Sequence, residues 1–236
     1  MLSLHAVNQF YGEHHTLQDI FLELKHGGAT CIIGAAGTGK TTLMNCIAGT
    51  QPVASGHILW QEEGQPLTEL AEMPSERRVE LGIGFQPGSP RFFSQLTVEQ
   101  NLHIVRQSMP EGPTAALPSV YNLFPILDAL RHVRVSELSE ENNQRLALAC
   151  ALQSNPRLLL LDEPCRGRSS GFIHELGTIL RRLNQDFGVA ILLAERNIPL
   201  IRVVTDRFVL LHRGRNVAHG RVALLDDLQV GAWLTP

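Results

Sequence analysis

One run of the sequence has the composition and spacing of a phosphate-binding loop. It fits the pattern G-x-x-x-x-G-K-[ST] and reads Gly34, Ala35, Ala36, Gly37, Thr38, Gly39, Lys40, Thr41, Thr42. Glycines let the backbone turn so that successive N–H groups point at one phosphate. Lys40 supplies a positive charge for the β and γ oxygens, and the Thr41 hydroxyl is a ligand for Mg²⁺. The run predicts a site for a nucleoside triphosphate.

The residues on either side of this loop favour the same interpretation. Residues 29–33 are β-branched or apolar and predict a buried strand, while residues 43–48 have the pattern of a helix that stops at Gly49. A phosphate-binding loop between a strand and a helix gains the positive end of the helix dipole. The alternative is a glycine-rich turn without a ligand, which this context disfavours.

Two acidic residues follow a second apolar run. Residues 158–161 are four leucines, and Asp162-Glu163-Pro164 comes directly after them. A buried strand that ends in two carboxylates can place one beside Mg²⁺ and the other beside an attacking water. Asp162 is therefore the expected magnesium residue and Glu163 the expected catalytic base. The alternative is a strand that merely ends in a polar turn.

Composition excludes several other classes of protein. The chain has 236 residues, 44% hydrophobic and 18% charged, with a net charge of −3. This balance gives no basic field for nucleic acid. Lys25 and Lys40 are the only lysines, so the N-K-x-D element that reads guanine in Ras-type GTPases is absent. No apolar run approaches the length of a membrane span. The four cysteines have no C-x-x-C spacing, and the ten histidines show no metal-ligand spacing.

The order of the expected elements predicts one α/β domain over residues 1–236. Residues 2–9, 18–25 and 56–60 predict an N-terminal antiparallel β layer with a turn at residues 12–15. Residues 81–85, 157–161, 188–194 and 207–211 predict strands of a parallel sheet, with a helix over 170–184. Residues of about 90–152 predict an inserted α-helical lobe with a loop at 109–118. The fold class is a P-loop NTPase core with these two additions.

Five segments together resemble the ATP-binding cassette of ABC transporters, and the resemblance covers nearly the whole chain. They are residues 34–42, Leu138-Ser139, Gln144-Arg145, residues 162–164 and residues 191–195. More narrowly, residues 82–85, 96–102 and 123–127 look like the subfamily that serves branched-chain amino acid and urea importers. Thr30-Cys31 and the L-F-P-I-L run at 123–127 favour the urea member.

The resemblance implies an ATPase subunit on the cytoplasmic face of the cell membrane, with ATP and Mg²⁺ as cofactors. Its implied partners are a second cassette, as a homodimer or a heterodimer, two membrane permease subunits and, indirectly, a solute-binding protein; nucleic acid is not among them. The paired cassettes lie head to tail, with each ATP between the P-loop of one and the signature segment of the other. Tyr11 in Phe10-Tyr11-Gly12 matches the aromatic residue that stacks on adenine.

The signature segment departs from the family pattern. Where such cassettes read L-S-G-G-Q, this chain reads Leu138, Ser139, Glu140, Glu141, Asn142. The lost glycines would let backbone N–H groups approach a γ-phosphate, whereas two carboxylates repel it. Alternatively, Ser139 caps a helix whose first turn favours acids. Both interpretations can hold together.

Three further positions depart from the pattern. An alignment without gaps puts Gly88 where the family has glutamine, so Gln86 lies two residues early and its contact with Mg²⁺ is left open. Arg196 occupies the switch position, where such cassettes commonly carry histidine and this subfamily often glutamine; arginine can hold a phosphate but cannot exchange a proton. Residues 165–169 replace the segment that crosses between paired cassettes. These changes predict two unequal ATP sites.

The sequence thus predicts the ATP-hydrolysing subunit of an importer for urea or a branched-chain amino acid. One alternative is a regulatory cassette that binds nucleotide but does not hydrolyse it, which the changed signature segment and Arg196 favour. A second is a soluble ABC protein of DNA repair or translation. Such proteins usually carry a coiled coil or two cassettes, and 236 residues leave no room for either.

Overall fold

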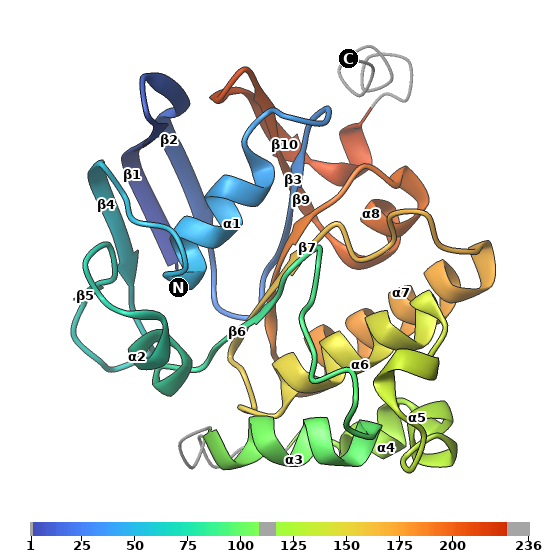
Figure 1. Cartoon of the computed structure of the whole chain (residues 1–236). Coiled ribbons are helices and arrows are strands. Elements are labelled where there is room, and N and C mark those ends of the chain that lie inside the picture. Colours follow the sequence, from blue (N-terminus) through green and yellow to red (C-terminus); the bar gives the residue numbers. More distant parts are fainter. Residues whose placement is uncertain (1, 109–116, 226–236) are drawn as a thin grey trace.

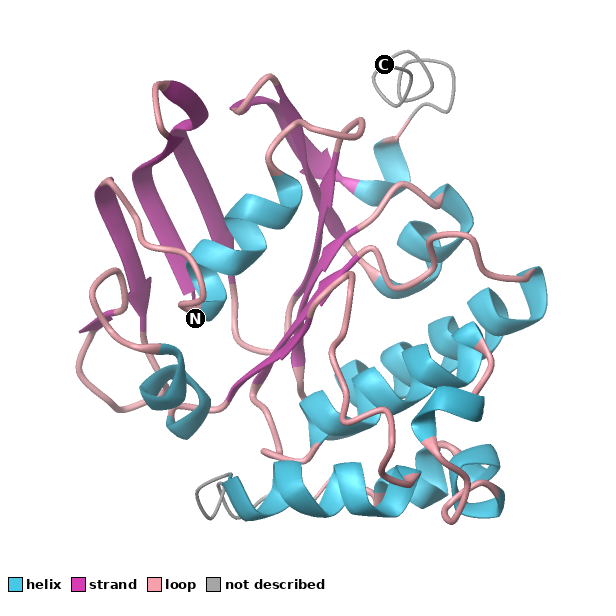
Figure 2. Ribbon diagram, in the orientation of Figure 1, coloured by secondary structure: helices cyan, strands magenta, loops and turns pink. Residues whose placement is uncertain are grey.

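Two β-sheets and two groups of helices make up the structure (Figures 1 and 2). The computed structural model describes residues 2–108 and 117–225. A four-stranded sheet has the order β2-β1-β4-β5, and a six-stranded sheet has the order β10-β9-β3-β8-β7-β6. The mixture of parallel and antiparallel strands confirms the predicted P-loop NTPase fold class.

The four-stranded sheet is the predicted antiparallel layer. Its strands are β1 (Leu2–Tyr11), β2 (His14–Leu24), β4 (Ser55–Trp60) and the short β5 (Thr68–Glu69). Strand β1 pairs antiparallel with β2 and with β4. The predicted turn at residues 12–15 was too long, because His14 and His15 already pair with Tyr11 and Phe10. Gly12, at φ 58°, makes the shorter turn possible.

Five strands of the six-stranded sheet are parallel. They are β3 (Ala29–Ile33), β6 (Ile83–Gln86), β7 (Leu158–Asp162), β8 (Ala190–Ala194) and β9 (Arg207–His212). β3, β7 and β8 are buried along their whole length, as expected of parallel strands covered on both faces. Strand β10 (Arg215–Arg221) pairs antiparallel with β9 and was not predicted.

Helix α1 (Lys40–Ala48) lies between the two sheets (Figure 1). Its apolar residues share a core with the inner faces of both sheets, including Leu22, Leu43 and Leu160. The short helix α2 (Ser75–Glu80) follows β5 and was not predicted. The P-loop therefore begins at the carboxyl end of one central strand and leads into a helix that is fixed on both sides.

The other face of the six-stranded sheet is covered by helices (Figure 2). They include α3 (Val98–Ser108), α4 (Val120–Leu123), α5 (Pro125–Ala129), the 3-10 turn η1 (Val135–Glu137) and α6 (Glu140–Leu152), which form the predicted helical lobe. Most of the predicted 109–118 loop lies outside the described residues. Helices α7 (Ser170–Phe187) and α8 (Ile198–Val204) and the 3-10 turn η2 (Val222–Leu224) complete this side.

Helix α7 runs three residues beyond its predicted end, because Gly188 at φ 67° accepts the left-handed conformation that ends the helix. Strand β8 therefore begins at Ala190 rather than at residue 188. In the described ranges, none of the helices has both the length and the apolar character that crossing a membrane requires. The four cysteines are free thiols, and burial raises the pKa of Cys46, Cys150 and Cys165 to about 12.

Candidate functional site

The loop between β3 and α1 has the geometry of a phosphate cradle. Gly37 and Gly39 have φ values of 79° and 100°, which favour glycine. Helix α1 begins after Gly39 without a capping side chain, so its first N–H groups have no such partner. Ala36, Gly37 and Thr41 are exposed, whereas Gly34, Ala35, Thr38 and Thr42 are buried. An uncapped helix start behind an exposed turn fits a bound phosphate.

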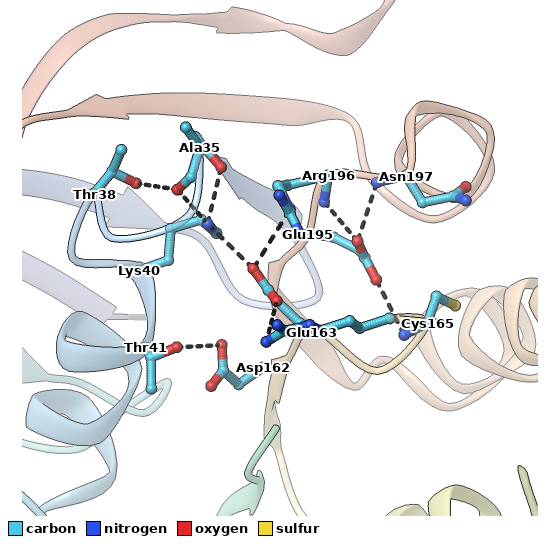
Figure 3. Close-up of polar contacts among 12 residues, drawn as sticks. Ala35, Thr38, Lys40, Thr41, Asp162, Glu163, Cys165, Glu195, Arg196 and Asn197 are labelled. Carbon is cyan, nitrogen blue, oxygen red and sulfur yellow. Dashed lines mark hydrogen bonds and ion pairs between the residues drawn. The ribbon is translucent and has the colours of Figure 1, made fainter. Parts of the chain in front are cut away.

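Lys40 is held inside this loop. Its Nζ donates to the carbonyl oxygens of Gly34 at 2.8 Å and Ala35 at 3.0 Å, and it lies 3.2 Å from Glu163 Oε1. The Thr38 hydroxyl donates to the same Ala35 carbonyl at 2.9 Å. Figure 3 shows the ammonium group between the loop and the carboxylate. The charge of Lys40 is thus buried, yet fully paired in the absence of nucleotide.

Asp162 ends β7 beside the start of α1. The Thr41 hydroxyl donates to Asp162 Oδ1 at 3.2 Å, so the two expected magnesium residues are in contact (Figure 3). Burial raises the pKa of Asp162 above its ordinary value, and the charge of Glu163 adds to this rise. The Thr41 hydroxyl, Lys40 and the backbone N–H of Gly88 oppose it. A hydroxyl and a carboxylate at this spacing are hard oxygen donors of the kind that Mg²⁺ prefers.

Glu163 lies among three cations. Besides Lys40, Arg166 Nη1 lies 3.7 Å from its Oε2 and Arg196 Nε lies 3.7 Å from its Oε1. Glu163 has a φ of 43°, which is rare for a residue with a Cβ, and its N–H donates to the carbonyl of Ala194 at 2.8 Å. This neighbouring strand holds the backbone so that the carboxylate points at the loop.

Glu195 organises the switch region, a role that the sequence did not indicate. It is buried and accepts from the N–H groups of Cys165 at 3.0 Å, Arg196 at 2.5 Å and Asn197 at 3.0 Å (Figure 3). The carboxylate therefore ties the chain after β7 to the chain after β8. The available sequence signal was its place at the end of an apolar strand, the same pattern that identified Asp162.

The structure corrects the expected position of Gln86. Its side chain is buried on the side of the sheet that carries α6 and α7, among residues that include Phe124, Gln144 and Phe172. Successive strand residues point to opposite faces, so this side chain cannot turn toward Thr41 and Asp162. A Cβ on Gly88 would lie 3.1 Å from Asp162 Oδ2. The glutamine position of the family is thus occupied by Gly88.

Tyr11 lies at the end of β1, half exposed, and its hydroxyl donates to Gln51 Oε1 at 3.3 Å. The neighbouring Phe10 stacks on His15 with ring centroids 4.0 Å apart. Residue His15 precedes Thr16, whose carbonyl oxygen would lie 3.2 Å from a Cβ on Gly39. The aromatic end of this hairpin is therefore next to the phosphate cradle. Stacking of Tyr11 on adenine stays a prediction.

The signature segment begins α6, as the capping interpretation predicted. The Ser139 hydroxyl accepts from the N–H of Asn142 at 3.3 Å, and Leu138 packs against the helical core. Glu140 pairs with Arg168, while Glu141 Oε1 accepts from the N–H of Ser169 at 3.0 Å. The two acids therefore contact the segment that follows β7 in the same chain.

The fold and these contacts define a P-loop nucleotide-binding protein. Comparison of the sequence with known families adds the next step: residues 17–166 match the ABC transporter family. The chain belongs to this family of ATPases and is an ABC transporter ATP-binding subunit. This confirms the resemblance seen in the sequence.

Two relatives agree in length with this chain. A high-affinity branched-chain amino acid transport ATP-binding protein of Pseudomonas aeruginosa is 35% identical over 95% of this chain and 94% of its own length. A probable branched-chain amino acid transport ATP-binding protein of Archaeoglobus fulgidus is 31% identical over 93% of this chain and 92% of its own length. Both names support the subfamily that the sequence indicated.

Solved structures show the same fold. A cassette of an ABC transporter superposes with a TM-score of 0.83 at 21% identity, covering 98% of this chain and 97% of that chain. A dimeric cassette described as a post-hydrolysis state bound to ADP and Pi has a TM-score of 0.81 at 20% identity, covering 94% and 99%. These likenesses confirm the arrangement of the elements.

Proposed function

We propose that this chain binds MgATP in its own P-loop and hydrolyses it to drive an importer of branched-chain amino acids. The observation that carries the proposal is the convergence of Lys40, Thr41, Asp162 and Glu163 at the carboxyl ends of β3 and β7. These strands are not neighbours in the sequence, and the four groups are those that phosphate, Mg²⁺ and an attacking water need.

The role of each residue follows from its contacts. Lys40, now paired with Glu163, exchanges that carboxylate for the β and γ oxygens when nucleotide binds. Thr41 and Asp162 would hold Mg²⁺, which supplies charge stabilisation at the phosphates. Glu163, released from Lys40, accepts a proton from the attacking water. Arg196, beside the same carboxylate, is permanently charged and can hold a phosphate oxygen.

The solute is proposed from the relatives. The two names above specify branched-chain amino acids, whereas the residues that favoured urea lie in the core: Thr30 and Cys31 are buried in β3, and Phe124 and Leu127 are buried in the helical lobe. Packing residues do not contact a solute. Permease subunits and a second cassette complete the proposed importer, which places this chain at the cytoplasmic face of the membrane.

Uptake measurements test this proposal. In cells that lack the gene for this chain, the wild-type gene should restore uptake of labelled leucine, and the Lys40→Ala gene should not. Labelled urea is measured in the same cells. Restoration of urea uptake alone would replace the amino acid by urea, and an unchanged uptake of both in the deleted cells would overturn the transport proposal.

The regulatory alternative is favoured by one observation. Glu163 is surrounded by three cations, and a carboxylate held in this way is a weak base. If the assembled transporter binds ATP through this chain but its turnover is unaffected by Glu163→Gln, the chain is a regulatory nucleotide-binding subunit.

A further inference from the structure

Three acidic residues form an exposed patch around the start of α6. We call Glu137, Glu140 and Glu141 the acidic patch. The Glu140 side chain is 83% exposed, although one of its oxygens pairs with Arg168. Glu141 is 32% exposed and lies 4.0 Å from Arg145, whose guanidinium is already paired with Glu175. Arg168 thus offsets one of the three charges, and the patch stays negative.

A second exposed cluster has the opposite sign. We call Lys40, Arg166 and Arg196 the basic rim, because they surround Glu163 at the nucleotide site. The Arg166 side chain is 75% exposed and that of Arg196 is 36% exposed. With Glu163 and Asp162 counted, one net positive charge remains. Arg166 and Arg196 both stand where the family pattern has other residues.

One short loop connects the two clusters. Arg166 faces Glu163 at the nucleotide site, and Arg168, two residues later, faces Glu140 at the acidic patch. Two residues span less than about 8 Å of chain. The clusters therefore lie side by side on one surface, with residues 163–169 between them. A surface that carries both signs side by side is self-complementary under a two-fold rotation.

We infer that this surface binds a second copy of this chain in the nucleotide-free state. The acidic patch of each copy lies against the basic rim of the other, so two sets of ion pairs close a two-fold dimer. The loop of residues 163–169 lies nearest the axis. The unusual acids and the unusual arginines of this chain thus have one common explanation, which is charge pairing between copies.

Nucleotide reverses the sign of one side of this contact. The inference rests here on the proposed function, in which the P-loop holds MgATP. The net negative charge of MgATP exceeds the single positive charge of the rim, so a loaded site repels the acidic patch. This dimer is therefore weakened by MgATP. It is an empty-state dimer, in which the acidic patch covers an unloaded site.

Sedimentation velocity on the purified full chain tests the inference. At low salt the nucleotide-free protein should be a dimer, and a non-hydrolysable ATP analogue with Mg²⁺ should raise its dissociation constant by about tenfold or more. Raising the salt should have a similar effect, because the paired groups are exposed. A monomer without nucleotide, or a dimer tightened by the analogue, would overturn the inference.

Two sets of variants make the test specific. Glu140→Gln with Glu141→Gln should weaken the nucleotide-free dimer, whereas the matched control Glu72→Gln with Glu76→Gln, on exposed residues outside the patch, should not. Glu141→Arg and Arg166→Glu should each weaken the dimer, and their combination in one chain should restore it. Failure of the combination to restore it would exclude direct pairing between these patches.

Calorimetry of the same samples separates the inference from the proposed function. If the analogue binds but the dimer does not dissociate, the inference is wrong and nucleotide binding stands. If the analogue does not bind, the proposed function fails at its first step.

Discussion

At the scale of single residues, the site is arranged as a closed set of charges. Lys40 pairs with Glu163, Thr41 donates to Asp162, and each of these contacts occupies a group that nucleotide or Mg²⁺ would need. A buried charge without a partner is costly, so this pairing keeps the empty site stable. Binding of nucleotide must exchange these contacts rather than add to them.

Replacing Lys40 should therefore affect binding more than stability. Lys40→Ala removes a buried charge-assisted contact to the phosphates, and we expect MgATP affinity to fall by about a hundredfold, or close to 3 kcal/mol. Calorimetry measures the affinity. Lys25→Ala, at the only other lysine and on an exposed position, is the matched control and should leave it unchanged. Equal affinities for both variants would refute the assignment of the loop.

Replacing Glu163 should separate binding from turnover. Glu163→Gln keeps the shape of the side chain but loses the base, and it frees Lys40 from its ion pair. We expect ATP to bind at least as tightly as in the wild type, while phosphate release falls by more than about a hundredfold. Equal rates of phosphate release would show that Glu163 is not the base.

Asp162 should show a conflict between stability and function. Burial raises the pKa of Asp162, so the folded protein disfavours the charged carboxylate. The resulting destabilisation is absent below the ordinary pKa and grows as pH rises through the raised one. Asp162→Asn should thus raise the melting temperature at neutral pH, with a smaller gain at acidic pH, and weaken Mg²⁺-dependent ATP binding. A gain that does not depend on pH would contradict this.

Sequence reasoning identified residues with a fixed motif spacing and missed those whose role depends on the fold. Lys40, Thr41, Asp162 and Glu163 lie where the motifs placed them. Gln86 was assigned by its residue type, but the alternation of its strand turns it to the opposite face. Glu195 was missed as an organising residue because its three donors come from two loops that only the sheet brings together.

At the scale of elements, a buried arginine fixes the end of α1. Arg78 is 2% exposed, and its Nη1 donates to the carbonyls of Cys46 at 2.6 Å and Ile47 at 2.8 Å. Its Nε donates to the carbonyl of Met73 at 2.9 Å. The helix that carries Lys40 is thus capped at its far end by α2. Arginine in a short polar segment reads as exposed, so the sequence gave no sign of this contact.

Removing this cap should cost stability. Arg78→Met leaves two carbonyls at the end of α1 without their donor, and we expect the free energy of unfolding to fall by about 2–4 kcal/mol. Urea denaturation measures the change. Arg77→Met, next along the chain and in an exposed pair with Glu80, should change it by less than about 0.5 kcal/mol. Similar losses in both variants would show that the buried contacts of Arg78 add nothing.

Element boundaries were predicted best where one residue ends the element. Gly49 stops α1 as expected, at φ 80°. The helix over 170–184 was cut short because its last turn is polar, and only the glycine at 188 ends it. Strand β10 was missed because its residues are mostly exposed and lack apolar alternation; pairing with β9 alone makes it a strand.

At the scale of the whole molecule, the signature segment differs from its expected state in one respect. The sequence predicted two free carboxylates facing a partner's phosphate. In the structure, Arg168 and the N–H of Ser169 bind them within the chain, and these contacts with Ser169, together with Arg145 and Arg168, lower the pKa of Glu141. Both carboxylates are therefore ionised at neutral pH, and the repulsion of a phosphate persists.

This repulsion should limit hydrolysis by the chain on its own. Glu140→Gly with Glu141→Gly should raise steady-state phosphate release by the purified chain, because the acids are gone and backbone N–H groups can approach the γ-phosphate of the opposite site. The gain should be larger at low salt, where exposed charges are least screened.

A second variant decides which of these two causes dominates. Glu140→Gln with Glu141→Gln removes the charges but keeps the side chains, so it should give most of the gain if repulsion limits the rate, and little if close backbone approach does. Paired instead with a cassette that has an intact L-S-G-G-Q, the wild-type chain should hydrolyse ATP in its own P-loop while the partner's P-loop stays nearly idle. Rapid phosphate release by the unchanged chain, or no gain in either double variant, would mean that residues 138–142 do not face the nucleotide of a second copy.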